Sequence, residues 1–404
     1  MNKTFPPLPP PAPAPGLRAL LIVCALAVVS QLYLPLPILP QVARDYGLDP
    51  TAAAGVMSAF GFAYATGFLI FGPLSDRLGR RKVMLWGLAV LALITGTLAI
   101  AGSAPLLLTG RTLQGLAAAA FPPVVIAYLA ERGTPQQRTW SVAWLSTAFL
   151  SAGLLGQIYG SAVGGRWGLG MALLPLAVIY ACSAWALHVT PAEAAPTPAP
   201  AQAWLDSYRP LGGLLADARL RRVYVPALPL LMCFVTFYMV LDADAGPVLQ
   251  AHGITPLVTR GVALPAFLTP LMVAAVMPRY GAERLTIAGL SIAAVGLALS
   301  ACAGVEHPLS LLATSVIFVA GVGISVPSLI ARVANVADAA TRGLAVAFYT
   351  FVLFVGASLG PSLAQYTAQW PMPLTLSLLA ILLGAAALYA FTGRHIAALP
   401  TRQA

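Results

Sequence analysis

Long apolar stretches without Asp, Glu, Lys or Arg follow one another along most of the chain. Eleven are present, at residues 19–43, 50–75, 83–110, 112–130, 139–165, 167–192, 223–241, 261–278, 285–305, 307–331 and 343–393. A membrane crossing takes about 20 apolar residues, so the last stretch is too long for one. It is interrupted by the turn-forming sequence Gln-Trp-Pro-Met-Pro at 369–373, and dividing it there gives twelve predicted spans.

The stretches are continuously apolar and lack the alternation of a membrane barrel, so we expect helices. Composition agrees with this interpretation. The 404 residues are 59% hydrophobic and 8% charged, with a mean hydropathy of +0.86. A soluble domain has about 25% charged residues. We therefore expect an all-α membrane protein with twelve transmembrane helices, and a soluble or secreted enzyme is excluded.

Basic residues are distributed unevenly between the two ends of the predicted spans. Of 22 Lys and Arg, Arg111 falls inside a span and three (Arg44, Arg166, Arg260) fall on one side. The remaining 18 share the other side: Lys3, Arg18, Arg77, Arg80, Arg81, Lys82, Arg132, Arg138, Arg209, Arg219, Arg221, Arg222, Arg279, Arg284, Arg332, Arg342, Arg394 and Arg402. The positive-inside rule then predicts that both termini and the central linker are cytoplasmic. The first apolar run is too long for a signal-peptide core, so we expect it to be the first span.

The chain divides near its middle, at a Pro-Ala-rich polar stretch between two sets of six spans. The predicted parts are a proline-rich cytoplasmic tail (1–17), a six-helix bundle (18–188), a cytoplasmic linker (189–221), a second bundle (222–393) and a C-terminal tail (394–404). Sequence echoes about 200 residues apart relate the two bundles: Gly72–Gly79 to Pro278–Gly281, Gly156-x-x-x-Gly160 to Gly356-x-x-x-Gly360, and Arg138 to Arg342. We infer a duplicated, pseudo-symmetric unit with a substrate site between the copies near mid-membrane.

The loop between spans two and three reads Gly72-Pro-Leu-Ser-Asp-Arg-Leu-Gly-Arg-Arg-Lys82. It closely resembles the signature loop of the major facilitator superfamily, G-x-L-x-D-R-x-G-R-R-x, and the alternative is a merely solvated basic loop. The resemblance implies the major facilitator fold and a latch that holds the outward-facing state. Its residues here are Gly72, Asp76, Arg77, Gly79, Arg80 and Arg81. The segments at 31–40 and 348–356 are similar to the twelve-span drug:proton antiporter branch of a bacterial-type inner (plasma) membrane.

Span four contains Arg111-Thr-Leu-Gln114-Gly115. An arginine inside the membrane is costly and therefore a functional candidate. The sequence resembles the superfamily's R-x-x-Q-G motif, which implies that Arg111 and Gln114 take part in proton coupling or organise the pathway. In the alternative interpretation Arg111 extends to the outer interface.

Span five carries small residues at helix-packing spacing, with counterparts in span eleven: Gly156, Gly160, Gly164, Gly356, Gly360 and Pro361. The first set resembles the antiporter motif G-x-x-x-G-P-x-x-G-G. Ser161 replaces the proline of that motif, which weakens the assignment to antiport.

The carboxylates placed within a span are Asp242 and Asp244, at the end of span seven. A carboxylate in a pathway of low dielectric can carry a proton. Alternatively, the span ends before them and both face the outside water. Substrate-binding candidates are Gln31, Tyr33, Tyr64, Gln157, Tyr238 and Tyr349.

These features favour a secondary transporter that exports a small amphipathic drug or metabolite by proton-coupled alternating access. The alternative is a proton symporter or facilitator that imports a sugar, an organic acid or a metal chelate. No G-x-x-x-x-G-K-[ST] or H-E-x-x-H sequence is present, so neither ATP coupling nor a membrane enzyme is expected. The expected partners are substrate, protons and lipid. We expect a monomer that binds no cofactor and no nucleic acid. No metal is expected either, since the four cysteines (Cys24, Cys182, Cys233, Cys302) form no metal motif.

Overall fold

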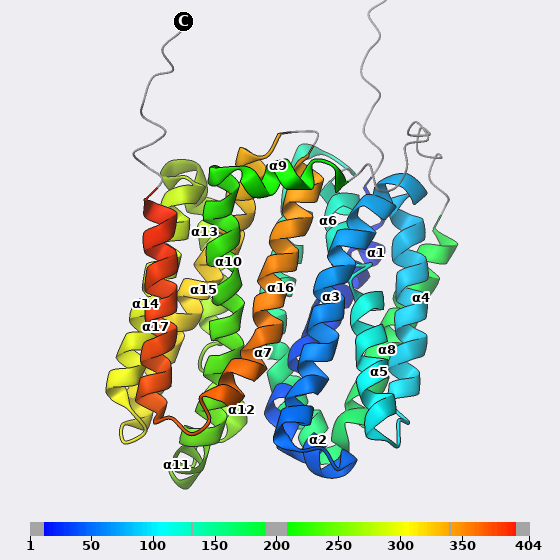
Figure 1. The fold of residues 1–404 in the computed structure, drawn as a ribbon. Coiled ribbons are helices and arrows are strands. Elements are labelled where there is room, and N and C mark those ends of the chain that lie inside the picture. Colours follow the sequence, from blue (N-terminus) through cyan, green and yellow to red (C-terminus); the bar gives the residue numbers. More distant parts are fainter. Residues whose placement is uncertain (1–11, 131, 191–207, 339–340, 393–404) are drawn as a thin grey trace, which may run out of the picture.

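The computed structural model of the chain describes residues 12–130, 132–190, 208–338 and 341–392, and this part is helical (Figure 1). Its first half comprises α1 (Pro15–Tyr33), η1 (Leu36–Ile38), α2 (Leu39–Tyr46), α3 (Pro50–Leu78), α4 (Arg80–Leu98), α5 (Ala104–Ala118), α6 (Pro122–Ala130), α7 (Pro135–Tyr159), η2 (Gly160–Gly164) and α8 (Gly165–Val189). Most of the predicted N-terminal tail and linker and the C-terminal tail lie outside the described residues, so the domain boundaries stay a prediction.

The second half repeats this organisation. It comprises α9 (Leu211–Ala216), α10 (Ala218–Val240), η4 (Leu241–Ala245), α11 (Gly246–Ala251), α12 (Pro256–Gly261), η5 (Leu264–Leu268), α13 (Thr269–Tyr280), α14 (Ala282–Ala303), α15 (Pro308–Val336), α16 (Arg342–Tyr366) and α17 (Met372–Phe391). The segments η1 and η5 are 3₁₀-helical, and η2 and η4 are π-helical turns.

The described residues account for twelve membrane crossings. Ten helical stretches are long and apolar enough to span a bilayer. One of them, Ser151–Val189, holds two crossings because the chain turns back at Gly168, where φ is 81°. A further crossing is broken into α12, η5 and α13. The predicted all-α fold of twelve spans is therefore confirmed, including the break between α16 and α17.

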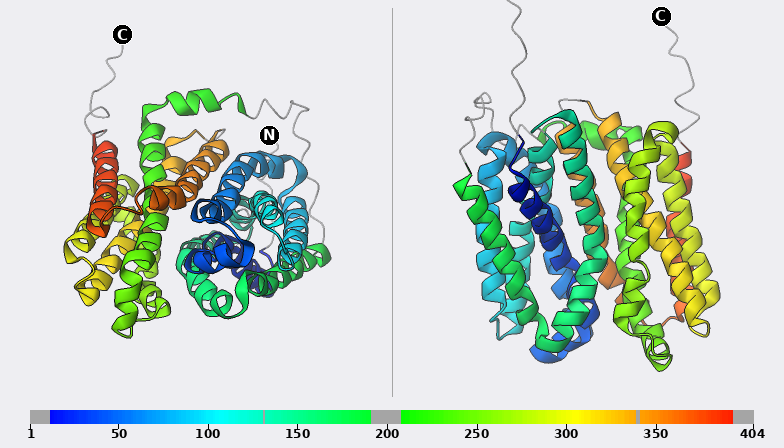
Figure 2. Two further views of the ribbon diagram at one scale, coloured as in Figure 1. Left: turned by 60° about the horizontal axis from the view of Figure 1, so that its bottom comes forward. Right: turned by 180° about the vertical axis from the view of Figure 1, so that it is seen from behind.

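The crossings form two groups that lie side by side. Seen obliquely from one end, α1–α8 surround one centre and α10–α17 another (Figure 2, left). The start of α1 and the end of α17 lie at the same end of the molecule, the upper end in Figure 1, as an even number of crossings requires. We call this the arginine-rich end, because Arg18, Arg81, Arg219 and Arg342 are at helix starts there. The other is called the opposite end.

Glycines bring equivalent helices into close contact in the two groups. A Cβ on Gly156 of α7 would lie 2.6 Å from the carbonyl oxygen of Ser30 in α1. In the second half, a Cβ on Gly356 of α16 would lie 2.0 Å from the carbonyl oxygen of Leu228 in α10. Both helix pairs therefore need glycine for their backbones to approach. The same contact at an offset of about 200 residues supports the duplicated unit inferred from the sequence echoes.

A second echo is a pair of turns at the arginine-rich end. Gly79 joins α3 to α4 with φ of 93°, and Gly281 joins α13 to α14 with φ of 78°. Side chains other than glycine rarely adopt such angles. The weak sequence similarity between 72–79 and 278–281 thus corresponds to one repeated turn geometry.

Two seams join the halves. Along the first, α3 lies against α16: Ser58 Oγ donates a hydrogen bond to the carbonyl oxygen of Ser358 over 2.8 Å, and the Phe354 ring packs edge-on against Tyr64 at 4.8 Å. Along the second, α7 lies against α12, η5 and α13. Since α3 starts at the opposite end, Ser58 places the polar contact of the first seam in that part of the membrane.

Candidate translocation site between the two halves

Arg111 is buried inside the first half and joins three helices. From α5, its Nε donates to the carbonyl oxygen of Val56 in α3 (3.3 Å) and its Nη2 donates to that of Gln31 in α1 (3.1 Å). Its Nη1 donates to Gln114 Oε1 over 2.6 Å, and its guanidinium carbon lies 4.4 Å from the centre of the Phe60 ring. Its exposed fraction is 0%. The alternative in which Arg111 extends to the outer interface is therefore wrong.

The partners found for the positively charged Arg111 side chain are all uncharged. The acceptors found for Arg111 are two backbone carbonyls and an amide oxygen, and a ring face stabilises its cation. Gln114 is in turn fixed because its Nε2 donates to Thr95 Oγ1 over 2.9 Å. Arg111 thus orders the meeting point of α1, α3 and α5 through neutral partners.

A second buried cation, Arg260, bridges the halves near the opposite end. Its Nη2 donates to Asp242 Oδ2 in an ion pair, and its Nε donates to Gln157 Oε1 over 3.1 Å. Gln157 belongs to α7 of the first half, whereas Asp242 and Arg260 belong to η4 and α12 of the second. The Arg260 side chain is 0% exposed and that of Asp242 is 31% exposed. The hydrogen bond from Arg260 to Gln157 crosses between the halves, and the ion pair with Asp242 fixes the guanidinium that makes it, so the arrangement is suited to hold this end closed.

Arg260 lies towards the end with few basic residues, as the sequence predicted, but it is buried within α12 of the broken crossing. Counting charge-free runs places any arginine that borders a run outside the membrane. The one sequence feature that could have indicated the burial of Arg260 is its position directly before the apolar run at 261–278. The two aspartates also differ in environment, since Asp242 forms an ion pair with Arg260 whereas Asp244 is exposed.

Both π-helical turns flank this cluster. Asp242 lies in η4, and η2 begins three residues after Gln157. A π-turn inserts an extra residue and re-aims the side chains around it, and such turns are frequent at functional sites. In η2, a Cβ on Gly160 would lie 2.1 Å from the carbonyl oxygen of Leu34, and one on Gly164 would lie 2.7 Å from the Ile38 side chain. The glycines of the antiporter-like motif therefore bind η2 to α1 and η1.

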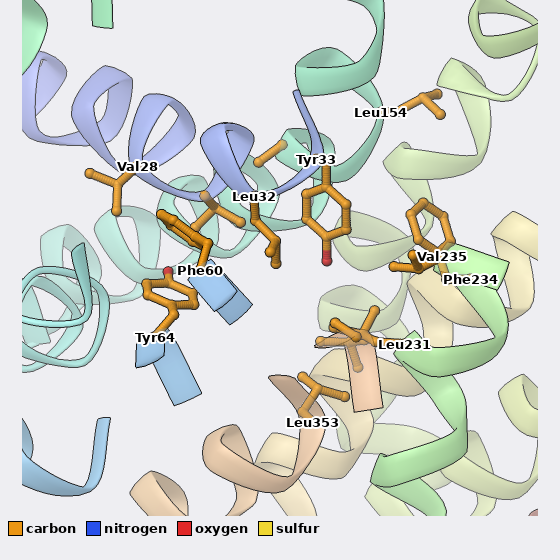
Figure 3. Close-up of a cluster of buried hydrophobic side chains, with 14 of the residues drawn as sticks. Val28, Leu32, Tyr33, Phe60, Tyr64, Leu154, Leu231, Phe234, Val235 and Leu353 are labelled. Carbon is orange, nitrogen blue, oxygen red and sulfur yellow. The ribbon is translucent and has the colours of Figure 1, made fainter. Parts of the chain in front are cut away.

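Buried aromatic and aliphatic side chains from both halves gather in one cluster (Figure 3). The Tyr33 ring of α1 packs edge-on against Phe234 of α10, with ring centres 6.0 Å apart. Its hydroxyl points towards Leu231 and Leu353 of the second half (Figure 3). The region combines apolar surface with a few polar groups, which is the usual character of small-molecule sites.

Several predicted substrate residues have buried polar atoms without a hydrogen-bond partner in the described structure. These atoms are both amide atoms of Gln31 and the hydroxyls of Tyr64 and Tyr238. Each such group costs about 1–3 kcal/mol when left unpaired, so these atoms mark positions where a ligand or water gains binding energy. The Tyr349 hydroxyl differs, because it donates to the Val326 carbonyl oxygen over 3.3 Å.

The loop with the superfamily signature lies at the arginine-rich end. Arg81 Nε and Nη2 donate to the carbonyl oxygens of Leu187 (2.8 Å) and His188 (2.9 Å), at the end of α8. A cation at a helix C-terminus is stabilised by the helix dipole. The side chain of Asp76 lies outside the described part of the structure. Gly72 faces the first seam, since a Cβ there would lie 3.8 Å from the Ala347 side chain.

Two equivalent groups of helices with buried charges where they meet are typical of secondary transporters. Family comparison agrees: a family model described as Major Facilitator Superfamily matches residues 21–361. The chain belongs to the Major Facilitator Superfamily. The resemblance read from the signature loop is confirmed, and with it the class of secondary transporters.

Similar proteins are known at moderate identity. "Uncharacterized MFS-type transporter YybF" of Bacillus subtilis is 29% identical over 170 residues, 40% of this chain and 41% of that protein. "Multidrug resistance protein D" of Escherichia coli is 26% identical over 200 residues, 49% of this chain and 51% of that protein. The chain thus matches about half the length of these relatives or less. The human organic anion transporter MFSD10 shares the fold, with a TM-score of 0.72 at 19% identity over 94% of this chain and 100% of that chain.

Proposed function

We propose that this transporter exports a small amphipathic molecule across a bacterial-type inner membrane in exchange for protons. The arginine-rich end then faces the cytoplasm, following the positive-inside rule. The observation that carries the proposal is the bridge from Gln157 through Arg260 to Asp242, because it couples a carboxylate to a contact between the halves. The similarity of this chain to Multidrug resistance protein D supports export as the direction of transport.

In the proposed cycle, the bridge closes the outer end while substrate enters from the cytoplasm. The partly exposed Asp242 receives a proton from outside and loses its charge. The ion pair between Asp242 and Arg260 is then lost, and the hydrogen bond from Arg260 to Gln157 weakens. The outer end opens, substrate leaves, and loss of the proton to the cytoplasm restores the pair. Arg111 keeps α1, α3 and α5 in register during this movement.

The charges also favour a class of substrate. Asp242 is already paired with Arg260, and the acceptors of Arg111 are neutral. A buried organic cation would need a free carboxylate. The exported molecule is therefore uncharged when bound, with an aromatic or aliphatic body and a few hydrogen-bonding groups that the side chains of Gln31, Tyr64 and Tyr238 satisfy.

Everted membrane vesicles with an acid lumen test the proposal. A panel of neutral aromatic antibiotics, lipophilic cations, sugars and organic acids is added while lumenal pH is followed by fluorescence. The proposal predicts proton release on addition of a neutral aromatic compound, and loss of this response in Asp242→Asn. Equal responses in that variant would refute the coupling through Asp242. A response to lipophilic cations alone would refute the substrate class.

One observation favours import as a second candidate. Ser161 in η2 stands where the antiporter motif has proline, and its buried hydroxyl has no partner in the described structure. Accumulation of substrate in intact cells, and its absence in everted vesicles, would establish proton symport or facilitated uptake instead.

A further inference from the structure

A pocket of about 450 Å³ lies at the arginine-rich end, where the starts of α1 and α7 converge. One wall consists of Pro15, Arg18, Ala19 and Ile22, which share a face of α1. The other consists of Gln136, Gln137, Trp140, Ser141 and Trp144, which share a face of α7. Seen from behind, the two helix starts are neighbours at the outer surface of the first half (Figure 2, right). The pocket belongs neither to the seams nor to the cluster around Arg260.

The electrostatics of this pocket favour an anion. Arg18 contributes a positive charge, and the described lining residues include no Asp or Glu. The N-termini of α1 and α7, helices of 19 and 25 residues, both lie at its mouth. Each helix N-terminus carries roughly half a positive charge. At α7 the N–H groups of Thr134 and Gln137 are already bonded within their capping box, so this end attracts an anion mainly through the helix dipole. The side-chain amide of Gln136 lines the pocket and offers a further hydrogen-bond donor.

The pocket also changes character with depth. Arg18 is the fourth residue of α1 and Gln136 the second of α7, so the polar groups lie close to the membrane surface. Trp144 lies nine residues beyond the start of α7, ~14 Å deeper at 1.5 Å per residue. Trp140 and Trp144 are 58% and 53% exposed, one helical turn apart. Exposed tryptophans of this kind sit at the level of lipid headgroups and upper acyl chains.

We propose that this pocket binds the phosphate headgroup of an anionic phospholipid of the cytoplasmic leaflet, with an acyl chain along Ile22 and Trp144. The phosphate lies between Arg18 and the start of α7. The lipid joins α1 to α7 at the arginine-rich end, where glycine contacts of the kind made by Gly156 are distant. This inference rests on the fold and the pocket and is independent of the direction of transport.

The test measures lipid binding to the purified, delipidated protein by tryptophan quenching. Phosphatidylglycerol and phosphatidylcholine with the same brominated acyl chains are titrated separately, since bromine quenches nearby indoles. We expect phosphatidylglycerol to bind at least fivefold more tightly. Arg18→Gln should weaken it about fivefold, as expected for one arginine near an anionic surface. The matched control Arg221→Gln, an exposed arginine at the same end outside the pocket, should have no effect.

Two further arms separate the sources of the signal. Trp140→Phe with Trp144→Phe should remove the difference in quenching between the wild type and Arg18→Gln, because the other exposed tryptophans (Trp86, Trp167, Trp185) lie outside the pocket. Native mass spectrometry should still detect the bound lipid. Glycerol 1-phosphate should not displace the brominated lipid at equal concentration. Equal affinity for both lipids, or equal effects of the Arg18 and Arg221 variants, would overturn the proposal. Full displacement by glycerol 1-phosphate would assign the pocket to a soluble phosphate instead of a lipid.

Discussion

Asp242→Asn tests the bridge between the halves through protein stability. The substitution keeps the size of the side chain but removes the charge that faces Arg260, whose own exposed fraction is 0%. Removing one partner of a fully buried pair costs about 3–5 kcal/mol. A surface pair contributes ~0–1 kcal/mol. Because the Asp242 side chain is 31% exposed, we expect an intermediate loss of about 2 kcal/mol in the free energy of unfolding.

A double-mutant cycle isolates the pair from other effects of the substitution. Asp242→Asn with Arg260→Gln removes both charges of the ion pair, so we expect this variant to be more stable than Asp242→Asn alone by at least ~1 kcal/mol. The assay is reversible unfolding in mixed micelles, followed by far-UV circular dichroism. Asp244→Asn is the control, because Asp244 is exposed, and it should change stability by less than about 0.5 kcal/mol.

Additive effects of the two substitutions would refute the reasoning. They would mean that Asp242 and Arg260 contribute independently, and the ion pair could not couple protonation to closure of the opposite end. A loss in Asp244→Asn as large as that in Asp242→Asn would equally contradict the assignment of the pair.

Three further changes probe other parts of the site. Gly160→Ala should lower the free energy of unfolding by about 2 kcal/mol in the same assay, because its Cβ would lie 2.1 Å from the Leu34 carbonyl oxygen. Gly165→Ala is the control and should leave stability unchanged, since a Cβ there meets nothing within 4 Å. Equal stabilities of the two variants would show that η2 tolerates a side chain at Gly160. Arg111→Lys retains the charge but cannot reproduce the three guanidinium hydrogen bonds, so exchange in vesicles should fall at least ~10-fold at equal expression, and wild-type exchange would count against the pathway role. Tyr33→Phe should raise KM about fivefold with unchanged thermal stability; an unchanged KM would remove its hydroxyl from the substrate site.

The sequence predicted the features that repeat along the chain. The twelve predicted spans and the uneven distribution of basic residues can be read from each apolar stretch and its flanking residues alone. Gly79 and Gly156 were also recognisable, because a tight turn and a close helix contact each require glycine whatever surrounds them. Such signals are local, so they need no knowledge of which helices meet.

The functional pairing of charges could not be predicted in the same way. Arg260 lies 18 residues from Asp242 and 103 from Gln157, and only the broken crossing α12–η5–α13 brings the three together. Hydropathy cannot distinguish an arginine in an outer loop from one enclosed by a broken helix. Likewise, Asp242 and Asp244 are indistinguishable in sequence, and the π-turn η4 separates their environments.

The most direct test of alternating access is to lock the opposite end. Ser58 and Ser358 meet there across the first seam, where the Ser58 hydroxyl bonds the Ser358 backbone. With the four native cysteines replaced, Ser58→Cys and Ser358→Cys are crosslinked in proteoliposomes with a short bifunctional reagent, and substrate-driven proton exchange is then followed. The account predicts that the crosslink forms without substrate and abolishes exchange, and that cleaving a reducible linker restores it. Undiminished exchange by the crosslinked protein would contradict it.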